Sequence, residues 1–488
     1  MDEVKHPRSN TVGQINLSLV KNCLQQGDAK LALQYCHELL AEDPQHVQTF
    51  LFAALAARSL GWFDNALDFT NKALVIAPNQ PTIQSIMGDI LLLQKRPELA
   101  LTTLLEAQQL GDCSAQTNFN IGSAYLALGV YQNAKIYFDK ALSLDPKMVA
   151  AHVNKGLAEH SLMNLDVALN CFDAALSIDP CNIDAKWNKP HVLLTLGQYE
   201  EGFKLYENRW KHPKIQLKKR KFNSRLWLGQ EHLSGKTILL YAEGGFGDTI
   251  QFIRYAKLFD ADVKLIIQCQ VPLMELISLM GISAQIISPG DEPPQHNFHC
   301  PLMSLPLAFG TTIDTVPHFD RYIHAPDQHL KKWDALMGHI TGSKIGVMVR
   351  GSGSSEVDKR SIELQKLESY LPTDACFVFL QKDLIESEKR FVQSRANWLA
   401  PCADFSETAA ICELLDVVIS VDTSVAHLAA AMGKPTLLLL PFRPDWRWGE
   451  KGENTVWYSS CTLLRQPQLD DWTSVFKSVS PTAARIVP

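Results

Sequence analysis

The sequence predicts an α-helical solenoid followed by a pair of α/β lobes, and three observations support this prediction. Alanines recur with a spacing of 34 residues through the first third of the chain, which is typical of stacked helix pairs. After residue 236, apolar β-rich runs alternate with helical stretches, as in parallel sheets covered by helices. At 488 residues the chain is also too long for one hydrophobic core. We expect a repeat array across 14–212, a linker across 213–235, a first lobe across 236–330 and a second lobe across 341–480.

The composition is that of an ordinary globular protein. Hydrophobic residues make up 46% and charged residues 20%, and the net charge of −6 argues against a nucleic-acid binder that depends on a basic surface. The N-terminus lacks the apolar core of a secretory signal, and no run is long enough to span a membrane. The 11 cysteines are scattered without a C-x-x-C pair, which indicates reduced thiols rather than disulfides or a zinc site. We therefore expect a cytoplasmic protein.

The first half of the chain contains a strict repeat. Small residues let two antiparallel helices approach, aromatic residues fill the space between them, and proline ends the second helix. The best copy runs from Ile121 to Pro146. The pattern resembles the tetratricopeptide repeat over about six units, the last with Pro190 in the glycine position. The series consists of Ala32, Ala66, Ala100, Ala134 and Ala168, continued by Gly202, with Pro44, Pro78, Pro146 and Pro180 in the same phase.

A second series with the same period consists of Asn120, Asn154 and Asn188, on the expected first helix of each unit. Asparagine is a mediocre helix former, but its amide both donates and accepts hydrogen bonds. The resemblance implies that this helix lines a concave groove. The series then predicts a ladder that holds an extended peptide, like the one in protein O-linked N-acetylglucosamine transferases. The alternative is that asparagine is a tolerated consensus residue at this position.

Residues 211–221 form a basic connector with six Lys and Arg residues. A short, isolated run of this kind favours a solvated linker. A membrane-binding or phosphate-binding patch is the alternative.

The second half contains seven apolar runs that predict parallel strands. Ligands of open parallel sheets bind at the carboxyl ends of the strands, so functional residues should lie in the loops that follow them. Two blocks of strands, 236–326 and 341–465, are separated by a polar stretch around 327–332. The expected strands are Thr237–Ala242, Val263–Gln268, Ala284–Ile287, Lys344–Val349, Cys376–Leu380, Asp416–Val421 and Pro435–Leu440.

The first loop of interest follows the expected strand at Thr237–Ala242 and contains Gly245, Gly247 and Asp248. Glycines allow a ligand to approach the backbone closely, and a helix N-terminus favours an anion. The spacing is not that of a dinucleotide-binding G-x-G-x-x-G loop. Asp248 is a candidate site residue, with a simple N-cap as the alternative interpretation.

The second loop contains Asp422, Thr423 and Ser424, with His427 about one turn into the next helix. Hydroxyls and free amides at a helix start can hold a diphosphate. Asp422 is expected either to hydrogen-bond a sugar or to cap the helix. A lone histidine here is otherwise typical of a structural residue.

The third loop begins at Arg350 and continues to Lys359 and Arg360. Glycine and serine after a strand, followed by cations, predict a diphosphate pocket in which the departing charge is neutralised without a metal. A flexible surface loop is the alternative for residues 354–357.

Together these stretches resemble glycosyltransferase family 9, the ADP-heptose heptosyltransferases, in the version fused to tetratricopeptide repeats. The matching segments include YAEGGFGDTIQFIRY, DKRSI and VDTSVAHLAAAMGKPTLLLLPFRPDWRW. The resemblance implies a GT-B fold with two Rossmann-like lobes. It also implies that Asp248 is the general base and that Lys359 or Arg360 contacts phosphate. The sequence departs from the family pattern at Gly244, in the loop that starts at Arg350, and at Gly449.

The resemblance further implies the nucleotide-sugar loop and the chemistry. Asp422, Thr423, Ser424 and His427 match the family's nucleotide-sugar loop. The family transfers a sugar with inversion from a nucleotide-diphosphate donor and uses neither a metal nor another cofactor. Trp446 or Trp448 is a candidate for stacking on the nucleobase, with buried packing as the alternative.

Three functional hypotheses remain at this point. The first is an enzyme that moves a sugar from a nucleotide donor to a protein or glycan acceptor recruited by the repeats. The second is a binding scaffold whose glycosyltransferase domain is inactive. The third is a protein O-glycosyltransferase of the N-acetylglucosamine type, suggested by the domain order. The sequence leaves the sugar, the base and the acceptor open.

Overall fold

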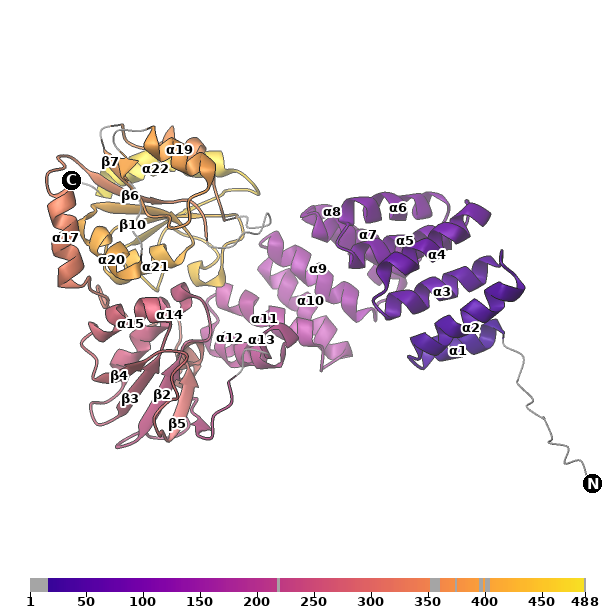
Figure 1. Cartoon of the computed structure of the whole chain (residues 1–488), viewed down its shortest axis with the longest axis horizontal. Helices are drawn as coiled ribbons and strands as arrows, with labels where there is room; N and C mark the ends of the chain where they lie inside the picture. Colours follow the sequence, from indigo (N-terminus) through magenta and orange to yellow (C-terminus); the bar gives the residue numbers. More distant parts are fainter. Residues whose placement is uncertain are drawn as a thin grey trace, which may run out of the picture. The chain divides into compact units, whose positions relative to one another are not determined.

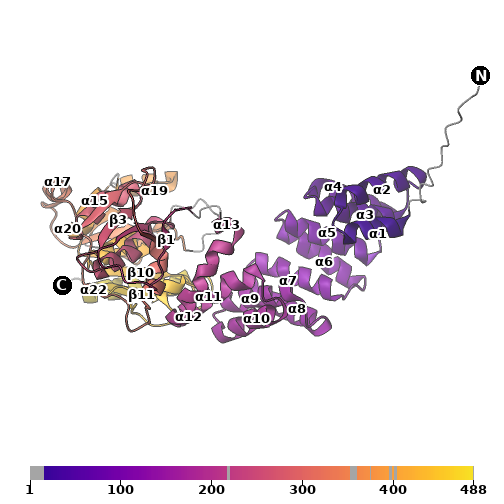
Figure 2. The same ribbon diagram turned by 90° about the horizontal axis from the view of Figure 1, so that it is seen from below.

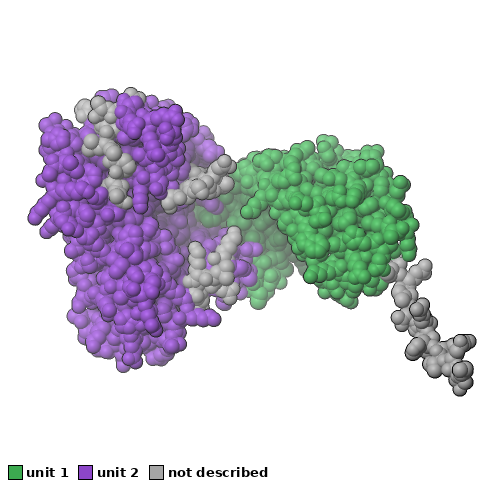
Figure 3. All heavy atoms as spheres, in the orientation of Figure 1, with its two compact units in different colours: residues 1–182 green, residues 183–488 purple. Residues whose placement is uncertain are grey.

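The protein, seen in a computed structural model, divides into two compact units, Met1–Asn182 and Ile183–Pro488 (Figure 3). The structure describes residues 16–216, 220–351, 360–373, 375–394, 398–399 and 404–486.

The described part of the first unit consists of antiparallel helix pairs, drawn in indigo to magenta in Figures 1 and 2. The helices are α1 (Leu17–Gln25), α2 (Ala29–Glu42), α3 (Val47–Ser59), α4 (Phe63–Ile76), α5 (Pro81–Leu93), α6 (Pro97–Gln109), α7 (Ala115–Ala127), α8 (Tyr131–Leu144), α9 (Val149–Ser161) and α10 (Leu165–Ile178). In two of the pairs, α7–α8 and α9–α10, a glycine faces an aromatic ring. A methyl group on Gly122 would lie 2.7 Å from the ring of Phe138, and one on Gly156 would lie 2.7 Å from the ring of Phe172.

The alanines of the 34-residue series pack where the helices of each pair meet. Ala32, Ala66, Ala100, Ala134 and Ala168 are all 0% exposed. A larger side chain at these positions would force the helices apart, because protein interiors have no spare volume. The packing role expected from the sequence is therefore confirmed.

The second unit begins with a further helix pair, the last of the repeat series. The segment contains α11 (Ile183–Thr195), α12 (Tyr199–Tyr206), the 3-10 helix η1 (Glu207–Lys211) and α13 (Pro213–Gln216). Aromatic side chains join this pair to the rest of the unit. The Trp457 indole nitrogen donates to the Tyr199 hydroxyl at 3.1 Å, and the ring of Phe203 meets that of Trp446 edge-on at 5.7 Å. By its contacts the last pair belongs with the lobes.

The first lobe is a parallel sheet with helices on it. Its elements are β1 (Arg225–Leu226), β2 (Thr237–Tyr241), α14 (Phe246–Phe252), η2 (Ile253–Leu258), β3 (Lys264–Gln268), α15 (Val271–Ser278), β4 (Ala284–Ile287), β5 (Phe298–Pro301), η3 (Leu302–Ser304) and α16 (Leu305–Ala308). Among the residues described, the strand order is β1-β5-β2-β3-β4, and every pairing is parallel.

The second lobe repeats this construction with a six-stranded sheet of described strands in the order β11-β10-β9-β6-β7-β8, again parallel throughout. Its elements are α17 (Asp327–Met337), β6 (Lys344–Met348), α18 (Leu364–Glu368), β7 (Cys376–Phe379), α19 (Glu386–Gln393), β8 (Trp398–Leu399), α20 (Phe405–Leu414), β9 (Val417–Val421), α21 (Ser424–Ala431), β10 (Thr436–Leu440), η4 (Trp446–Trp448), β11 (Cys461–Arg465) and α22 (Trp472–Ile486). The two sheets agree with the GT-B pair of Rossmann-like lobes expected from the sequence. Both carboxyl edges carry loops of interest.

The structure differs from the sequence-based boundaries between the array and the first lobe. Residues 225–226 were expected in a linker, but they form β1, which pairs with β5. Trp227, directly after β1, is buried. Arg220, in the basic connector, donates to Gln268 at the end of β3. Arg220, one of the described connector residues, therefore lies against the first lobe.

Candidate active site

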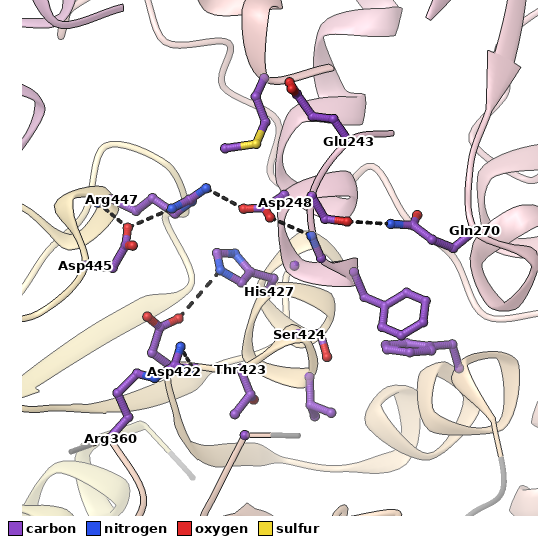
Figure 4. Close-up of a pocket in the computed structure, with 18 of the residues that line it drawn as sticks. Glu243, Asp248, Gln270, Arg360, Asp422, Thr423, Ser424, His427, Asp445 and Arg447 are labelled. Carbon is purple, nitrogen blue, oxygen red and sulfur yellow. Dashed lines mark hydrogen bonds and ion pairs between the residues drawn. The ribbon is translucent and has the colours of Figure 1, made fainter. Parts of the chain in front are cut away.

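A cavity of about 1030 Å³ opens at the carboxyl ends of the strands in the second unit. One side is formed by the turn between β2 and α14, and another by the loop between β9 and α21 together with η4 (Figure 4). Helix α11 and the segment after α12 supply a third side. The cavity is thus built by both lobes and by the last repeat.

The glycine turn after β2 fits around the carboxylate of Asp248. The Gly245 amide donates to Asp248 Oδ2 at 2.7 Å, which caps helix α14. A methyl group on Gly244 would lie 2.1 Å from the same oxygen, and one on Gly247 would lie 2.8 Å from the ring of His427. Gly244 and Gly247 are therefore required by close approach, the first to Asp248 and the second to the opposite lobe.

Asp248 lies at the centre of a charged network that crosses between the lobes (Figure 4). Its second oxygen, Oδ1, accepts a hydrogen bond from Arg447 on η4. Arg447 also donates to Asp445 at 2.8 Å and to Gln251 on α14 at 2.6 Å. Burial disfavours the charge of Arg447, but Asp445 and Asp248 outweigh it and raise the pKa of the guanidinium. The N-cap interpretation of Asp248 is wrong, because Gly245 is the N-cap of α14 and Asp248 is the third helical residue, whose carboxylate accepts from the N-cap amide. The site interpretation is compatible with this geometry.

The loop after β9 brings Asp422 and His427 together in the same cavity. His427 Nε2 lies 3.7 Å from Asp422 Oδ1, and His427 Nδ1 lies 2.9 Å from the Tyr458 hydroxyl. Burial, together with Arg447, lowers the pKa of His427 to about 3. The imidazole is therefore neutral at pH 7, and its approach to Asp422 is not an ion pair. Burial also raises the pKa of Asp422, and nearby Asp445 adds to this effect.

Helix α21 begins at the cavity wall. The Thr423 hydroxyl caps the helix by accepting from the Ala426 amide, and Ser424 lines the cavity as the first helical residue. Arg360 reaches the same place, where it donates to the Asp422 carbonyl at 3.5 Å. A helix start and a guanidinium at one wall can bind an anionic group such as a diphosphate.

Another predicted donor-site residue, Arg350, is not brought to this wall. Arg350 is not among the residues that line the cavity. Its guanidinium instead donates to both carboxylate oxygens of Glu388 on α19, with nitrogen–oxygen distances of 2.9 and 3.0 Å. Lys359 lies outside the described residues. Arg350 is better explained as an ion-pair partner that anchors its loop, because Glu388 is almost fully buried.

The two candidate stacking residues, Trp446 and Trp448, are both buried. Trp446 lines the cavity and is enclosed by aromatic rings on its other side, among them Phe203. Trp448 does not line the cavity, and its ring stacks on His427 at 5.2 Å. Packing accounts for Trp448, whereas Trp446 keeps contact with the cavity.

The three asparagines of the predicted peptide ladder have partners within the chain. Asn120 is only 3% exposed and accepts from Gln116. Asn154 donates to Ser123, and Asn188 donates to the Asp184 carbonyl. The burial of Asn120 favours a structural role for it, whereas Asn154 and Asn188 are half-buried.

Sequence reasoning missed the buried pair of Arg209 on η1 and Glu243, which lies in the loop after β2. The guanidinium contacts both carboxylate oxygens, at 2.8 and 3.2 Å, and donates to Ser304 at 2.7 Å. Burial raises the pKa of Glu243 and Arg209 opposes this effect. No local signal marks the pair, because the partners are 34 residues apart.

Sequence reasoning also missed Arg254 on η2, which joins the two lobes. It is 1% exposed. It donates to the Trp457 carbonyl and to the Tyr322 hydroxyl, and its guanidinium lies 4.5 Å from the centre of the Tyr458 ring.

Two features are absent from the described residues. No helix in this part of the chain is long and apolar enough to cross a membrane. Nor do the described His, Cys, Asp and Glu residues form a group of three or more that could hold a metal ion.

Family comparisons match both halves of the chain. Residues 382–471 match glycosyltransferase family 9 (heptosyltransferase). Residues 18–81 and 115–148 match tetratricopeptide-repeat families.

The chain is also similar to two curated proteins. It is 21% identical over 526 residues to the protein FlbA of Caulobacter vibrioides, a match that covers 94% of this chain and 85% of FlbA. It is 23% identical over 184 residues to the BBSome complex member BBS4 of Bos taurus, which covers 38% of this chain and 36% of BBS4.

Similar solved structures match a smaller part of the chain. MamA of Desulfovibrio magneticus is 22% identical with a TM-score of 0.30, over 33% of this chain and 92% of MamA. A tetratricopeptide-repeat protein of Thermus thermophilus is 22% identical with a TM-score of 0.33, over 36% of this chain and 97% of its own.

Proposed function

We propose that this chain, which joins tetratricopeptide repeats to a glycosyltransferase family 9 domain, moves a sugar from a nucleotide-diphosphate donor to a protein or glycan acceptor. We further propose that transfer inverts the anomeric carbon and needs no metal or cofactor. The observation that carries the proposal is the position of Asp248, whose carboxylate faces the same cavity as the Asp422–Ser424 loop of the opposite lobe.

Asp248 is the proposed general base. An acceptor hydroxyl has a pKa far above 7, so a carboxylate must take its proton as the new bond forms. The acceptor oxygen bonds to the anomeric carbon, the bond from that carbon to the diphosphate oxygen breaks, and the nucleoside diphosphate leaves with the electron pair. Gly245 and Arg447 each hold one carboxylate oxygen of Asp248 and so fix its orientation for this step.

The opposite wall is the proposed donor site. The leaving diphosphate gains negative charge, which the start of helix α21 at Thr423 and Ser424 can stabilise together with Arg360. Asp422 is positioned to hydrogen-bond the sugar or the ribose. His427 is neutral and buried, so it shapes the wall rather than supplying charge.

The alternative is a tetratricopeptide scaffold with an inactive transferase domain. Two observations favour it: Arg350 is turned to Glu388 rather than to the cavity, and Arg447 occupies one oxygen of Asp248. The two functions differ in whether a nucleotide sugar binds and turns over.

The test is a calorimetric screen of ADP-, GDP-, UDP- and dTDP-sugars, followed by transfer assays with Asp248→Asn. Donor affinity should change little, whereas transfer should fall by about 100-fold or more, the usual contribution of a general base. Asp262→Asn is the matched control, because Asp262 is an exposed aspartate of the same lobe. Equal transfer by Asp248→Asn and the parent would remove Asp248 from the mechanism. Binding of no donor in the screen would favour the scaffold.

A further inference from the structure

The last repeat does more than connect the array to the lobes, because its side chains line the catalytic cavity. Trp187 and His191 on α11 and Trp210 on η1 are among the lining residues. The Thr195 carbonyl at the end of α11 lies beside Gly449, directly after η4. One helix therefore leads from the repeat surface to the element that carries Arg447.

His191 has a defined tautomer. Its Nδ1 lies 2.8 Å from the Trp187 carbonyl oxygen. A carbonyl only accepts, so Nδ1 must carry the hydrogen of this bond. Burial lowers the pKa of His191, which keeps the ring neutral. Nε2 then has a lone pair that can accept a hydrogen bond from a ligand in the cavity.

Trp187 provides a fixed aromatic surface beside this acceptor. Its ring lies 5.0 Å from that of His191 and 4.8 Å from that of His212. The side chain is half-buried and lines the cavity. A tryptophan held in this way offers a large contact area at little entropic cost.

The neighbouring charge on this side is already neutralised. Arg209 lines the cavity, but Glu243 and Glu207 both pair with its guanidinium. It is therefore a poor partner for an anionic acceptor, such as a phosphorylated glycan. A neutral chain that offers hydrogen-bond donors fits this wall better.

We propose that Trp187 and His191 form an acceptor subsite, and that its occupant is an extended polypeptide segment. The inference rests on the proposed transferase function. From Asp184 to Thr195, α11 rises about 16 Å, the length of about five residues of extended chain. In the subsite a peptide amide donates to His191 Nε2 while a side chain packs on Trp187.

The experiment uses the full-length chain and the donor selected by the calorimetric screen. Acceptors are a degenerate mixture of Ser- and Thr-containing dodecapeptides and, separately, a mixture of methyl glycosides. Donor hydrolysis by water is measured without acceptor. We expect the peptides, and not the glycosides, to receive the sugar.

Variants of the two residues separate the contacts. Trp187→Ala should lower kcat/KM for the peptides about tenfold or more, and Trp187→Phe should restore most of it. His191→Asn can keep the hydrogen bond to the Trp187 carbonyl but has no acceptor at the Nε2 position. It should therefore lower kcat/KM for the peptides about five- to tenfold. His191→Gln, which places an amide near the Nε2 position, should lower kcat/KM for the peptides by less. Trp62→Ala is the matched control, because Trp62 is 48% exposed and lies in the first unit.

The outcomes distinguish this subsite from the proposed function itself. Sugar transfer to glycosides alone, or peptide kinetics of Trp187→Ala and His191→Asn equal to those of the parent, would overturn the subsite and leave the transferase standing. So would a parent that hydrolyses the donor but modifies neither acceptor mixture. A parent that binds no donor overturns the proposed function and the subsite with it. If Trp187→Ala fails to fold by circular dichroism, the Phe, Asn and Gln variants decide.

Discussion

Replacing Arg209 with methionine should destabilise the second unit by about 3 to 5 kcal/mol, the usual cost of breaking a buried ion pair by removing one partner. The side chains of Arg209 and Glu243 are 3% and 6% exposed. Methionine fills a similar volume but leaves the Glu243 carboxylate buried without its counter-charge. Burial already raises the pKa of Glu243, and the attraction of Arg209 that opposes this would be lost.

A double-mutant cycle isolates the pair from its surroundings. Glu243→Gln leaves Arg209 paired with Glu207. It should lower the free energy of unfolding by about 1 to 3 kcal/mol. The double variant Arg209→Met/Glu243→Gln should cost less than the sum of the single changes, with a coupling of about 1 to 3 kcal/mol. Strict additivity would mean that the two charges do not interact energetically.

Urea unfolding followed by tryptophan fluorescence is the appropriate assay. Nine of the ten tryptophans lie in the second unit, so the signal reports on it. The matched control is Arg225→Met, because Arg225 and Glu231 form an ion pair with side chains 71% and 42% exposed. Such a surface pair contributes about 0 to 1 kcal/mol. A cost for Arg209→Met no larger than that of Arg225→Met would refute the reasoning.

Four other expectations can be measured. Gly247→Ala should lower the free energy of unfolding by about 1 to 3 kcal/mol and weaken donor binding, since its methyl group would lie 2.8 Å from the ring of His427. Gly245→Ala, whose methyl group would make only an ordinary contact at 3.7 Å from Asp248 Oδ2, should resemble the parent in urea unfolding. Between pH 7 and pH 4.5 the parent should lose about 2.5 kcal/mol more stability than His427→Gln. The reason is that the folded imidazole, with a pKa of about 3, stays neutral while the unfolded one is protonated below pH 6.5, and equal losses would contradict this. Donor binding and transfer should survive EDTA, and a requirement for Mg²⁺ or Mn²⁺ would point to another transferase class. Changing Asn154 and Asn188 to alanine should raise the acceptor KM about tenfold, and an unchanged KM would mean that they do not contact the acceptor.

The repeats and most strands could be predicted because their signals are local. Gly122 and Phe138 lie on the two helices of one repeat unit and pack against each other. Because the unit recurs with a fixed period, the sequence pattern indicates this packing. The expected strand at Ala284–Ile287 matches β4. Strands β1, β5, β8 and β11 were missed. β1 and β8 contain two residues each, too few for a pattern, and β5 ends in a proline, which argues against a strand when only sequence is considered.

The candidate site was predictable only in part, for a related reason. Asp248 and Asp422 follow strands, and the rule for parallel sheets places such residues at one edge. The residues that pair with these side chains cannot be predicted by this rule. Arg447 is 199 residues from Asp248, and nothing in the sequence near Arg350 indicates Glu388 on α19 as its partner rather than a phosphate. Tertiary packing decides which cation faces the cavity.

The last helix pair belongs by its contacts to the lobes, and this has a consequence for how such a chain can be shortened, lengthened or recombined. Cutting after residue 212, where the repeat period ends, would separate Tyr199 and Phe203 from their partners Trp457 and Trp446. It would also leave the buried Glu243 carboxylate without Arg209. Cutting after residue 182 leaves all these contacts in one piece. Gain or loss of repeats during evolution should therefore be confined to units that precede α11, while α11 and α12 are inherited with the enzyme-like domain as a single block.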